Sequence, residues 1–422
     1  MTGRIRYQQL GLAHPYRWLA ALAGAGLWAL LGAATGLYLV INGHHVTGMD
    51  NQVVWGLPHV FAILLILSGA GTLALAGLAP RLTGAADDPW GRLGTATAMA
   101  LLLGGLAVLS LDLGSPQRLL AALALNLHSS FSRNLLLYSG FIATALLYLG
   151  TLLEPRLRRY AALAGGLATL VALALALNVG SIFGMLAARP AYGGAIAMPL
   201  FLASALAYGT AAFSLAWLSA LYSQGQPSPP ATTERLSLLL TSAVLALAAL
   251  LALHLLTLLY QPGLRGAARF LLIDGGIYPI LFWLGVVAIG IITPTLLLLR
   301  KAARVDSRTL AWASGLVLVG GLAHLFVMIV GVQALPLQIF PGQEVSGAVF
   351  DEEAASYAPT GWEFLLGLGG IGLALAILLI ALRALPLTPR HLPGEAQAET
   401  TRRHPAPASG SETGRSSSSQ SA

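Results

Sequence analysis

The sequence predicts an all-α, polytopic membrane protein with about ten transmembrane helices. Only 9% of the 422 residues are charged, whereas soluble globular proteins carry about 25%. A further 56% are hydrophobic before the 48 glycines are counted, and the mean hydropathy is +0.76. A soluble fold could not cover that much apolar surface with polar groups, so the composition excludes one.

Ten segments are long enough to cross the hydrocarbon core, which takes roughly 20 mostly apolar residues. The first is too long for the apolar region of a signal peptide and is followed by nine more, so we expect it to remain in the protein. In chain order the predicted spans are 17–41, 54–79, 93–111, 134–153, 161–187, 195–222, 236–260, 276–300, 309–333 and 362–386.

The charge distribution predicts how the chain is oriented. Of the 23 Lys and Arg residues, 18 lie on the side of the two termini and 5 on the other side. Positive residues mark the cytoplasmic side of a membrane protein. Residues 1–16 and the tail are therefore expected in the cytoplasm, with a membrane domain over 17–388. The tail, 389–422, is mostly polar and is predicted to be disordered.

The sequence contains no cysteine, which excludes a thiolate-bound iron–sulfur cluster, a c-type haem and a zinc–thiolate site. Any redox chemistry would depend on a partner or on a bound organic molecule. The basic residues lie between apolar stretches and form no stripe, so nucleic acid is not an expected partner.

The outward loops carry most of the polar residues that could do chemistry. The inward loops are short and basic, as in EPRLRRY at 154–160. The outward ones bring Asp, Asn, His, Arg, Tyr and Pro to the membrane surface, at 43–52, 111–120, 177–194, 272–279 and 333–363. The candidate site is therefore predicted near the outer face.

His59 lies just inside the second span, after Trp55 and Pro58. One interpretation is that Trp55 and His59 belong to an interfacial aromatic belt. The other is that His59 exchanges protons with a quinone, because histidine donates and accepts protons near neutral pH.

Asp112 ends the third span, and an acid at membrane depth suggests a function. It could pair with Arg118 to hold the intervening turn, act directly on a ligand, or do both. Tyr138 follows near the outward end of the fourth span, where it could hydrogen-bond a ligand or anchor the helix.

Polar residues in the second half of the chain leave alternatives open as well. His254 and His324 lie in spans that run outward, where they could ligate a haem or hydrogen-bond across helices. Asp274, Tyr278 and Glu363 stand at outward ends of spans, and Arg189 is a candidate partner for one of these acids. The pattern from Gly32 to Gly36 predicts close helix packing.

Five segments resemble the NrfD/polysulfide-reductase-type family of quinone-interacting membrane subunits. Within that family they look most like the DsrP branch, the membrane subunits of the Dsr complexes associated with sulfite reductase. The segments are GHHVTGMDNQVVWGLPHVFAI (43–63), LDLGSPQR (111–118), GSIFGMLAARPAY (180–192), DGGIYPILFWLG (274–285) and QALPLQIFPGQEVSGAVFDEEAASYAPTGWE (333–363).

The resemblance implies two helical bundles with extra spans, no haem or iron–sulfur cluster in this chain, and a site for menaquinone or ubiquinone near the outer face. It also implies a periplasmic iron–sulfur subunit, a c-type cytochrome and other membrane subunits as partners. Family members often have Arg where this chain has Ser115, which weakens any anion site there. His59 and Asp112 are expected to act on protons. The candidate quinone-binding residues are Asn51, His59, Asp112, Arg118 and Tyr138, with Asp274, Tyr278 and Glu363 assigned to the second bundle.

The expected function is electron transfer between the membrane quinone pool and the iron–sulfur subunit, within a complex of dissimilatory sulfur metabolism. Two alternatives are a secondary transporter for a small sulfur compound and a structural anchor without a quinone site. A transporter would need polar residues near the membrane midplane, whereas the acids here cluster at one face. The loop 333–361 has four acids and no Lys or Arg, and it is expected to help seat the partner through Glu344, Asp351, Glu352 and Glu353.

Overall fold

The computed structural model describes residues 7–10, 15–83, 89–113, 128–335 and 354–389. Within these ranges ten helices are long and apolar enough to cross a membrane, which confirms the predicted all-α, multi-pass fold. The first seven spans are built on α1 (Pro15–Asn42), α2 (Leu57–Thr83), α3 (Pro89–Leu111), α4 (Ser130–Leu153), α5 (Ala161–Gly184), α6 (Ala197–Ser223) and α7 (Pro230–Tyr260).

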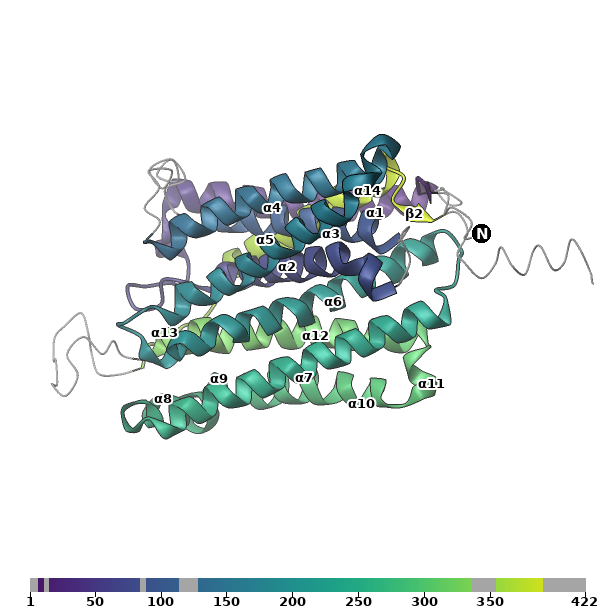
Figure 1. The fold of residues 1–422 in the computed structure, drawn as a ribbon. Coiled ribbons are helices and arrows are strands. Elements are labelled where there is room, and N and C mark those ends of the chain that lie inside the picture. The colour runs from purple at the N-terminus through teal and green to yellow at the C-terminus, as the bar shows by residue number, and fades with distance from the viewer. Residues whose placement is uncertain (1–6, 11–14, 84–88, 114–127, 336–353, 390–422) are drawn as a thin grey trace, which may run out of the picture.

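The last three spans are less regular. The eighth runs through α9 (Ile277–Ile280), a π-helical segment (Leu281–Ile292) and α10 (Thr293–Leu299). The ninth joins α12 (Ser307–Phe326), a second π-helical segment (Val327–Gly331) and α13 (Val332–Ala334). The tenth is α14 (Gly361–Ala384). Short helices, α8 (Arg265–Arg269) and α11 (Lys301–Arg304), lie at opposite ends of the bundle (Figure 1).

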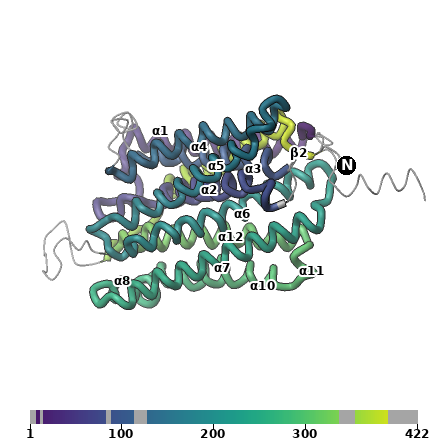
Figure 2. The backbone as a smooth tube through the Cα atoms, in the orientation of Figure 1, coloured from purple at the N-terminus to yellow at the C-terminus, as the bar shows by residue number. Residues whose placement is uncertain are grey.

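The helices form two groups. The first is organised around α2, whose apolar window is buried throughout, and includes α3, α4 and α5. The second consists of α7, the eighth span and α12, and α6 packs against both groups. Figure 2 shows the order of these layers along the backbone, with α6 and α12 between the α2 group and the pair α7–α10.

The first and last spans pack together beside the first group. A Cβ on Gly32 of α1 would meet the backbone of Gly369 in α14, so the two helices touch at glycine. Gly36 makes room for the side chain of Leu111 of α3. The predicted role of Gly32 and Gly36 in close packing is confirmed. This contact brings α14 back to the helices that begin the chain.

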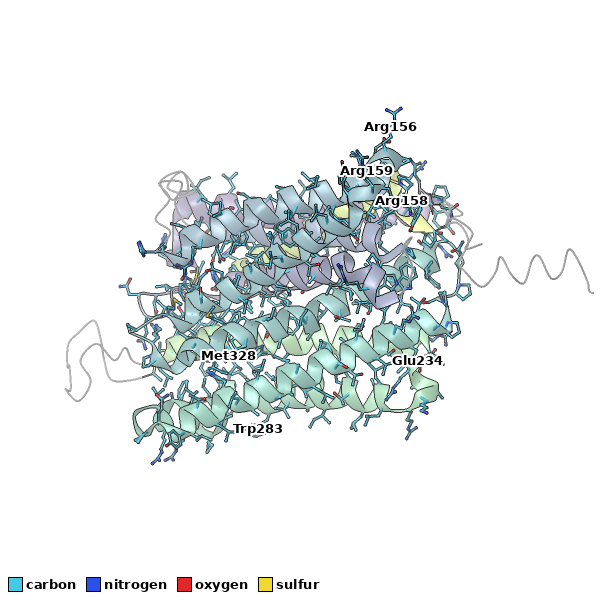
Figure 3. All side chains as sticks on the ribbon, viewed as in Figure 1. Arg156, Arg158, Arg159, Glu234, Trp283 and Met328 are labelled. Atoms are coloured by element: carbon cyan, nitrogen blue, oxygen red, sulfur yellow. The ribbon has the colours of Figure 1, made fainter. Side chains whose placement is uncertain are left out.

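Both terminal segments lie at one end of the bundle, as an even number of spans requires. There β1 (Tyr7–Gln8) pairs with β2 (Thr388–Pro389) in an antiparallel ladder. Arg156, Arg158 and Arg159 stand at that same end (Figure 3). The segments that carry the candidate site residues connect the helices at the opposite end.

Candidate functional site

Five polar residues gather where α1, α2, α3 and α14 reach the end opposite the terminal strands. The packing of α14 onto α1, α2 and α3 brings them together. Hydrogen bonds and electrostatic contacts connect them. We call them the outer cluster: His44, His59, Asp112, Tyr357 and Glu363.

His59 is placed by the first turn of α2 and is 8% exposed. Its ring stacks on Trp55, with centroids 5.5 Å apart and an angle of 16° between the planes. Trp55 in turn meets the edge of Phe183 at 5.4 Å. Among the described residues His59 has no hydrogen-bond partner, and Asp112 is close enough to act on it electrostatically. An imidazole that stacks on an aromatic ring and feels the charge of a carboxylate is suited to exchange protons.

Asp112 follows the last turn of α3 and faces His44 across 3.7 Å, from Oδ1 to Nε2. The Asp112 side chain is 7% exposed and the His44 side chain 26%. Both facing atoms are buried and lack a hydrogen bond within the described residues. The polar contact with Asp112, and then its charge, raise the pKa of His44 despite partial burial. A protonated His44 therefore stabilises the Asp112 carboxylate.

Glu363 is fully buried and connects the start of α14 to the segment between α1 and α2. It forms a capping box with Thr360 at the start of α14, accepting from the Thr360 backbone N–H at 2.6 Å and hydroxyl at 3.0 Å. It also accepts from the Gly48 N–H at 3.1 Å and from the Tyr357 hydroxyl. Four donors around one carboxylate compensate its burial. This environment makes Glu363 an anchor for the outer cluster.

The expectation that Glu363 belongs with Asp274 in the second bundle is wrong. Its bond to Gly48 places it against the segment between α1 and α2, and its charge reaches His44. The reason is the glycine contact between α1 and α14, which packs the tenth span against the first.

Tyr357 connects this anchor to the start of α2. Its hydroxyl donates to Glu363 and accepts from the Leu57 N–H at 2.7 Å. Burial, and then the bond to Glu363, raise the pKa of Tyr357, so the phenol stays protonated and can donate. Because Leu57 lies two residues before His59, this bond helps fix the position of the imidazole.

Gln333 holds the backbone of Trp55. Its Oε1 accepts from the Val54 N–H at 3.1 Å and the Trp55 N–H at 3.0 Å. Its Nε2 donates to the carbonyls of Trp55 and Ile329, both at 2.9 Å. The buried side-chain amide of Gln333 forms all four hydrogen bonds. The position of the Trp55 ring, which stacks on His59, therefore depends on Gln333.

No acid among the described residues pairs with Arg189, which was a candidate partner for one of the acids at the outward ends of spans. Its guanidinium donates to backbone carbonyls, with Gln333 O at 2.8 Å and Gln52 O on the other side. Carbonyls at the end of a helix have no partner within it and attract a cation. Burial lowers the pKa of Arg189. Arg189 thus joins the end of α13 to the segment before α2.

The remaining candidates of the first half lie outside this cluster. Asn51 is exposed, and Arg118 lies outside the described residues, so its predicted pairing with Asp112 is not described. Tyr138 is buried on α4 and receives a long bond from Asn134 at 3.4 Å. Asn134 in turn accepts from Asn178 of α5 at 2.7 Å, which makes Tyr138 part of a separate polar group.

Asp274 and Tyr278 do not meet at one site. Asp274 pairs at 2.7 Å with Arg269, and both side chains are well exposed. Tyr278 is buried, with its ring 6.2 Å from Phe326, and Phe326 lies 6.0 Å from Tyr357. Tyr278 therefore touches the periphery of the outer cluster through aromatic rings, while Asp274 stays at the surface.

Three residues of this region, His44, Tyr357 and Gln333, were not among the sequence candidates. A signal existed for one connection: Thr360 and Glu363 have the spacing of a capping box before an apolar run. His44 and Gln333 had no such signal, because their partners are distant in sequence.

Comparison with known proteins gives one family. A family model described as "Polysulphide reductase, NrfD" matches residues 45–336, well over half of the chain. The matched range begins beside His44 and includes His59, Asp112 and Gln333. No curated protein matches the sequence.

Proposed function

The chain belongs to the NrfD, or polysulphide reductase, family, and from this premise we propose that it is the quinone-interacting membrane subunit of a multi-subunit redox complex. In this proposal it passes electrons between the membrane quinone pool and a periplasmic iron–sulfur subunit. Members of the family are membrane subunits that work with other subunits of redox complexes.

The observation that carries the proposal is that His59 and Asp112 lie at the same end of the neighbouring helices α2 and α3 and interact electrostatically. His59 starts about one turn into its helix and Asp112 ends its own. At ~1.5 Å per residue, both lie within about 10 Å of the predicted interface. A group at that depth meets lipid on one side and protons from the outer aqueous phase on the other.

The polar atoms of the outer cluster fit a quinone head group. Asp112 Oδ1 and His44 Nε2 are buried without a hydrogen bond among the described residues, and His59 has no such partner either. We assign His59 and Asp112 to hold the head group, against the aromatic wall formed by Trp55. The bound quinone, menaquinone or ubiquinone, supplies two-electron chemistry coupled to two protons.

The protein's own residues move and hold the protons. The His59 imidazole serves as proton donor and acceptor, and the nearby Asp112 favours its protonated form through electrostatic attraction. His44, which is more exposed and pairs with Asp112, exchanges protons with the outside. Glu363, Tyr357 and Gln333 hold the surrounding backbone.

The partners remain part of the proposal. We place an iron–sulfur subunit on the outer face, with a c-type cytochrome and further membrane subunits in the same assembly. The resemblance to the DsrP branch suggests a complex of dissimilatory sulfur metabolism. Most of the acidic loop 333–361, with Glu344, Asp351, Glu352 and Glu353, lies outside the described residues. Reversing Asp351, Glu352 and Glu353 to Lys should lower retention of the partner in pull-downs and reduce its sensitivity to salt.

The proposal also requires both termini in the cytoplasm of a cell with an inner membrane. Reporter fusions after Arg158 should give a cytoplasmic signal, and fusions near Gly347 a periplasmic one. The opposite pattern would place the outer cluster on the wrong side for a periplasmic partner.

The decisive experiment compares His59→Ala and Asp112→Asn with His45→Ala, a change at an exposed histidine of the same outer region. Each variant complex is purified and its quinol turnover measured. We expect normal assembly for all three and a loss of ~10²–10⁴-fold for His59→Ala, the usual effect of removing a general base. Wild-type turnover in both His59→Ala and Asp112→Asn would place the quinone site elsewhere.

A further inference from the structure

The second half of the molecule contains two buried histidines that the proposed function does not use. His254 of α7 is 0% exposed and His324 of α12 is 2% exposed. Both ring nitrogens of His254, and Nε2 of His324, have no hydrogen-bond partner among the described residues. Buried polar atoms are normally paired because leaving them unpaired costs free energy. Three unpaired nitrogens in one region therefore need a partner that the protein does not supply.

The two rings form one group with a tyrosine. The hydroxyl of Tyr208 on α6 lies 2.7 Å from His324 Nδ1. His254 is close enough to His324 for their rings to interact electrostatically. Three spans thus contribute one polar side chain each to a common position in the bundle interior.

The outer end of this group reaches a surface loop. Gly193, in the loop before α6, has a left-handed φ of 84°, and a Cβ there would collide with the His254 ring. The positive φ and the close contact with the His254 ring both require glycine at position 193. The His254 ring therefore lies directly beneath the backbone of the outer loop, with no side chain between them.

The inner end reaches the middle of the membrane. His254 lies six residues before the end of α7, about 9 Å deep at ~1.5 Å per residue. His324 lies ten residues before the end of the 28-residue ninth span, and Tyr208 lies eleven residues after the start of the 27-residue helix α6. Both are therefore near the middle of their spans.

We propose that His254, His324 and Tyr208 form a proton-carrying site, reached by water from the outer face, apart from the outer cluster. An imidazole can take a proton at one nitrogen and release one from the other, which suits it to relay protons. A water molecule gives a proton to Nε2 of His324, the ring passes the proton on Nδ1 to the Tyr208 oxygen, and the original hydroxyl proton of Tyr208 goes to a second water molecule in the site. Atoms and charge balance without an oxidant.

The surroundings limit the site to one proton at a time. No carboxylate among the described residues acts on either ring. The nearby titratable groups are Tyr208 on α6 and Tyr192 on the outer loop, whose hydroxyl donates to Ile329 O. Arg189 is engaged with backbone carbonyls. Two imidazolium rings side by side would repel each other, so the pair carries a single positive charge in transit.

The first test uses the purified wild-type complex and does not depend on quinone chemistry. Exchange of the imidazole C2 hydrogen for deuterium passes through the protonated ring and needs water. We expect measurable exchange at His254 and His324 on the time scale that completes it at exposed His45. Tyr208→Phe should change the exchange rate at His324 and leave His45 unaltered. Retention of hydrogen at both buried rings, while His45 exchanges fully, would overturn the proposal.

The second test measures function in vesicles. His254→Gln and His324→Gln keep hydrogen-bonding side chains that cannot titrate, and His45→Gln is the matched control. We expect quinol turnover to be retained and the protons moved per electron pair to fall in both buried variants. An unchanged proton ratio in both would contradict the proposal. So would a b-type haem band after dithionite reduction that either variant removes. A wild-type complex without quinol turnover would refute the quinone function and leave the exchange result to decide this site.

Discussion

The outer cluster and the buried histidine pair handle polar groups in the membrane in opposite ways. The cluster contains two acidic residues, Asp112 and Glu363, at the end of the bundle opposite the terminal strands, and surrounds Glu363 with donors. The pair lies deeper and consists of groups that can be neutral, His254 and His324. The free energy of burying a charge rises with depth in hydrocarbon. Acidic side chains are therefore found near the end of the bundle, and side chains that can be neutral lie deeper.

The largest effect is expected from removing Glu363, the residue that anchors the outer cluster. Glu363→Ala leaves four donors without their acceptor, and each unsatisfied buried group costs ~1–3 kcal/mol. We expect a marked fall in the melting temperature of the purified protein, together with loss of quinol turnover. Asp274→Ala is the matched control, since its pair with Arg269 is exposed and worth ~0–1 kcal/mol. Equal melting temperatures for the two variants would show that Glu363 is not an anchor.

A smaller effect is expected at Gln333, where a substitution can show whether this residue positions Trp55 or takes part in proton transfer. Gln333→Leu removes the bonds to Val54 and Trp55, which should destabilise the protein by ~1–3 kcal/mol and weaken quinol binding through displacement of the Trp55 ring. We expect KM to rise more than kcat falls, because His59 itself is unchanged. Gln333→Glu retains the acceptor and should recover part of the loss in KM. A fall in kcat at constant KM would assign Gln333 to the chemistry instead.

The pH dependence of stability should distinguish the two regions. The folded-state pKa of His44 is raised by Asp112, so their pair contributes fully below the ordinary pKa of histidine. The contribution is lost as pH rises through the raised value. For a partly exposed pair we expect at most ~1 kcal/mol. Chemical denaturation at several pH values should show this loss in the wild type and not in His44→Gln. A loss that persists in His44→Gln would come from another group.

The smallest expected effect concerns Tyr138. Its only described side-chain hydrogen bond is 3.4 Å long and its ring lies outside the outer cluster. Tyr138→Phe should therefore change stability by less than ~1 kcal/mol and leave quinol turnover near that of the wild type. A severe loss of turnover would move the proposed site from α2 and α3 toward α4.

The sequence predicted several residues of the candidate site, but not which of them lie close together in the fold. His59 and Asp112 were predicted on adjacent spans near one face, because each stands at an outward helix end. Glu363 was assigned to the wrong group, since nothing local indicates that the tenth span packs on the first. His44 and Gln333 were missed because a histidine beside a span or a glutamine at its end has no pattern until its partner is known.

The sequence by itself determined the ten spans, the sharing of one end by both termini, and the concentration of polar residues at the other end. These follow from local rules, since every backbone polar group in lipid must be bonded within its own helix and hydropathy records that requirement. Only the tertiary structure decided which helix ends meet. That choice depends on contacts such as Gly32 with Gly369, which join residues hundreds of positions apart through shape alone. Interhelical packing in lipid lacks the hydrophobic signal that marks the spans, so the partners of His44, Glu363, His254 and His324 appear only in the folded chain.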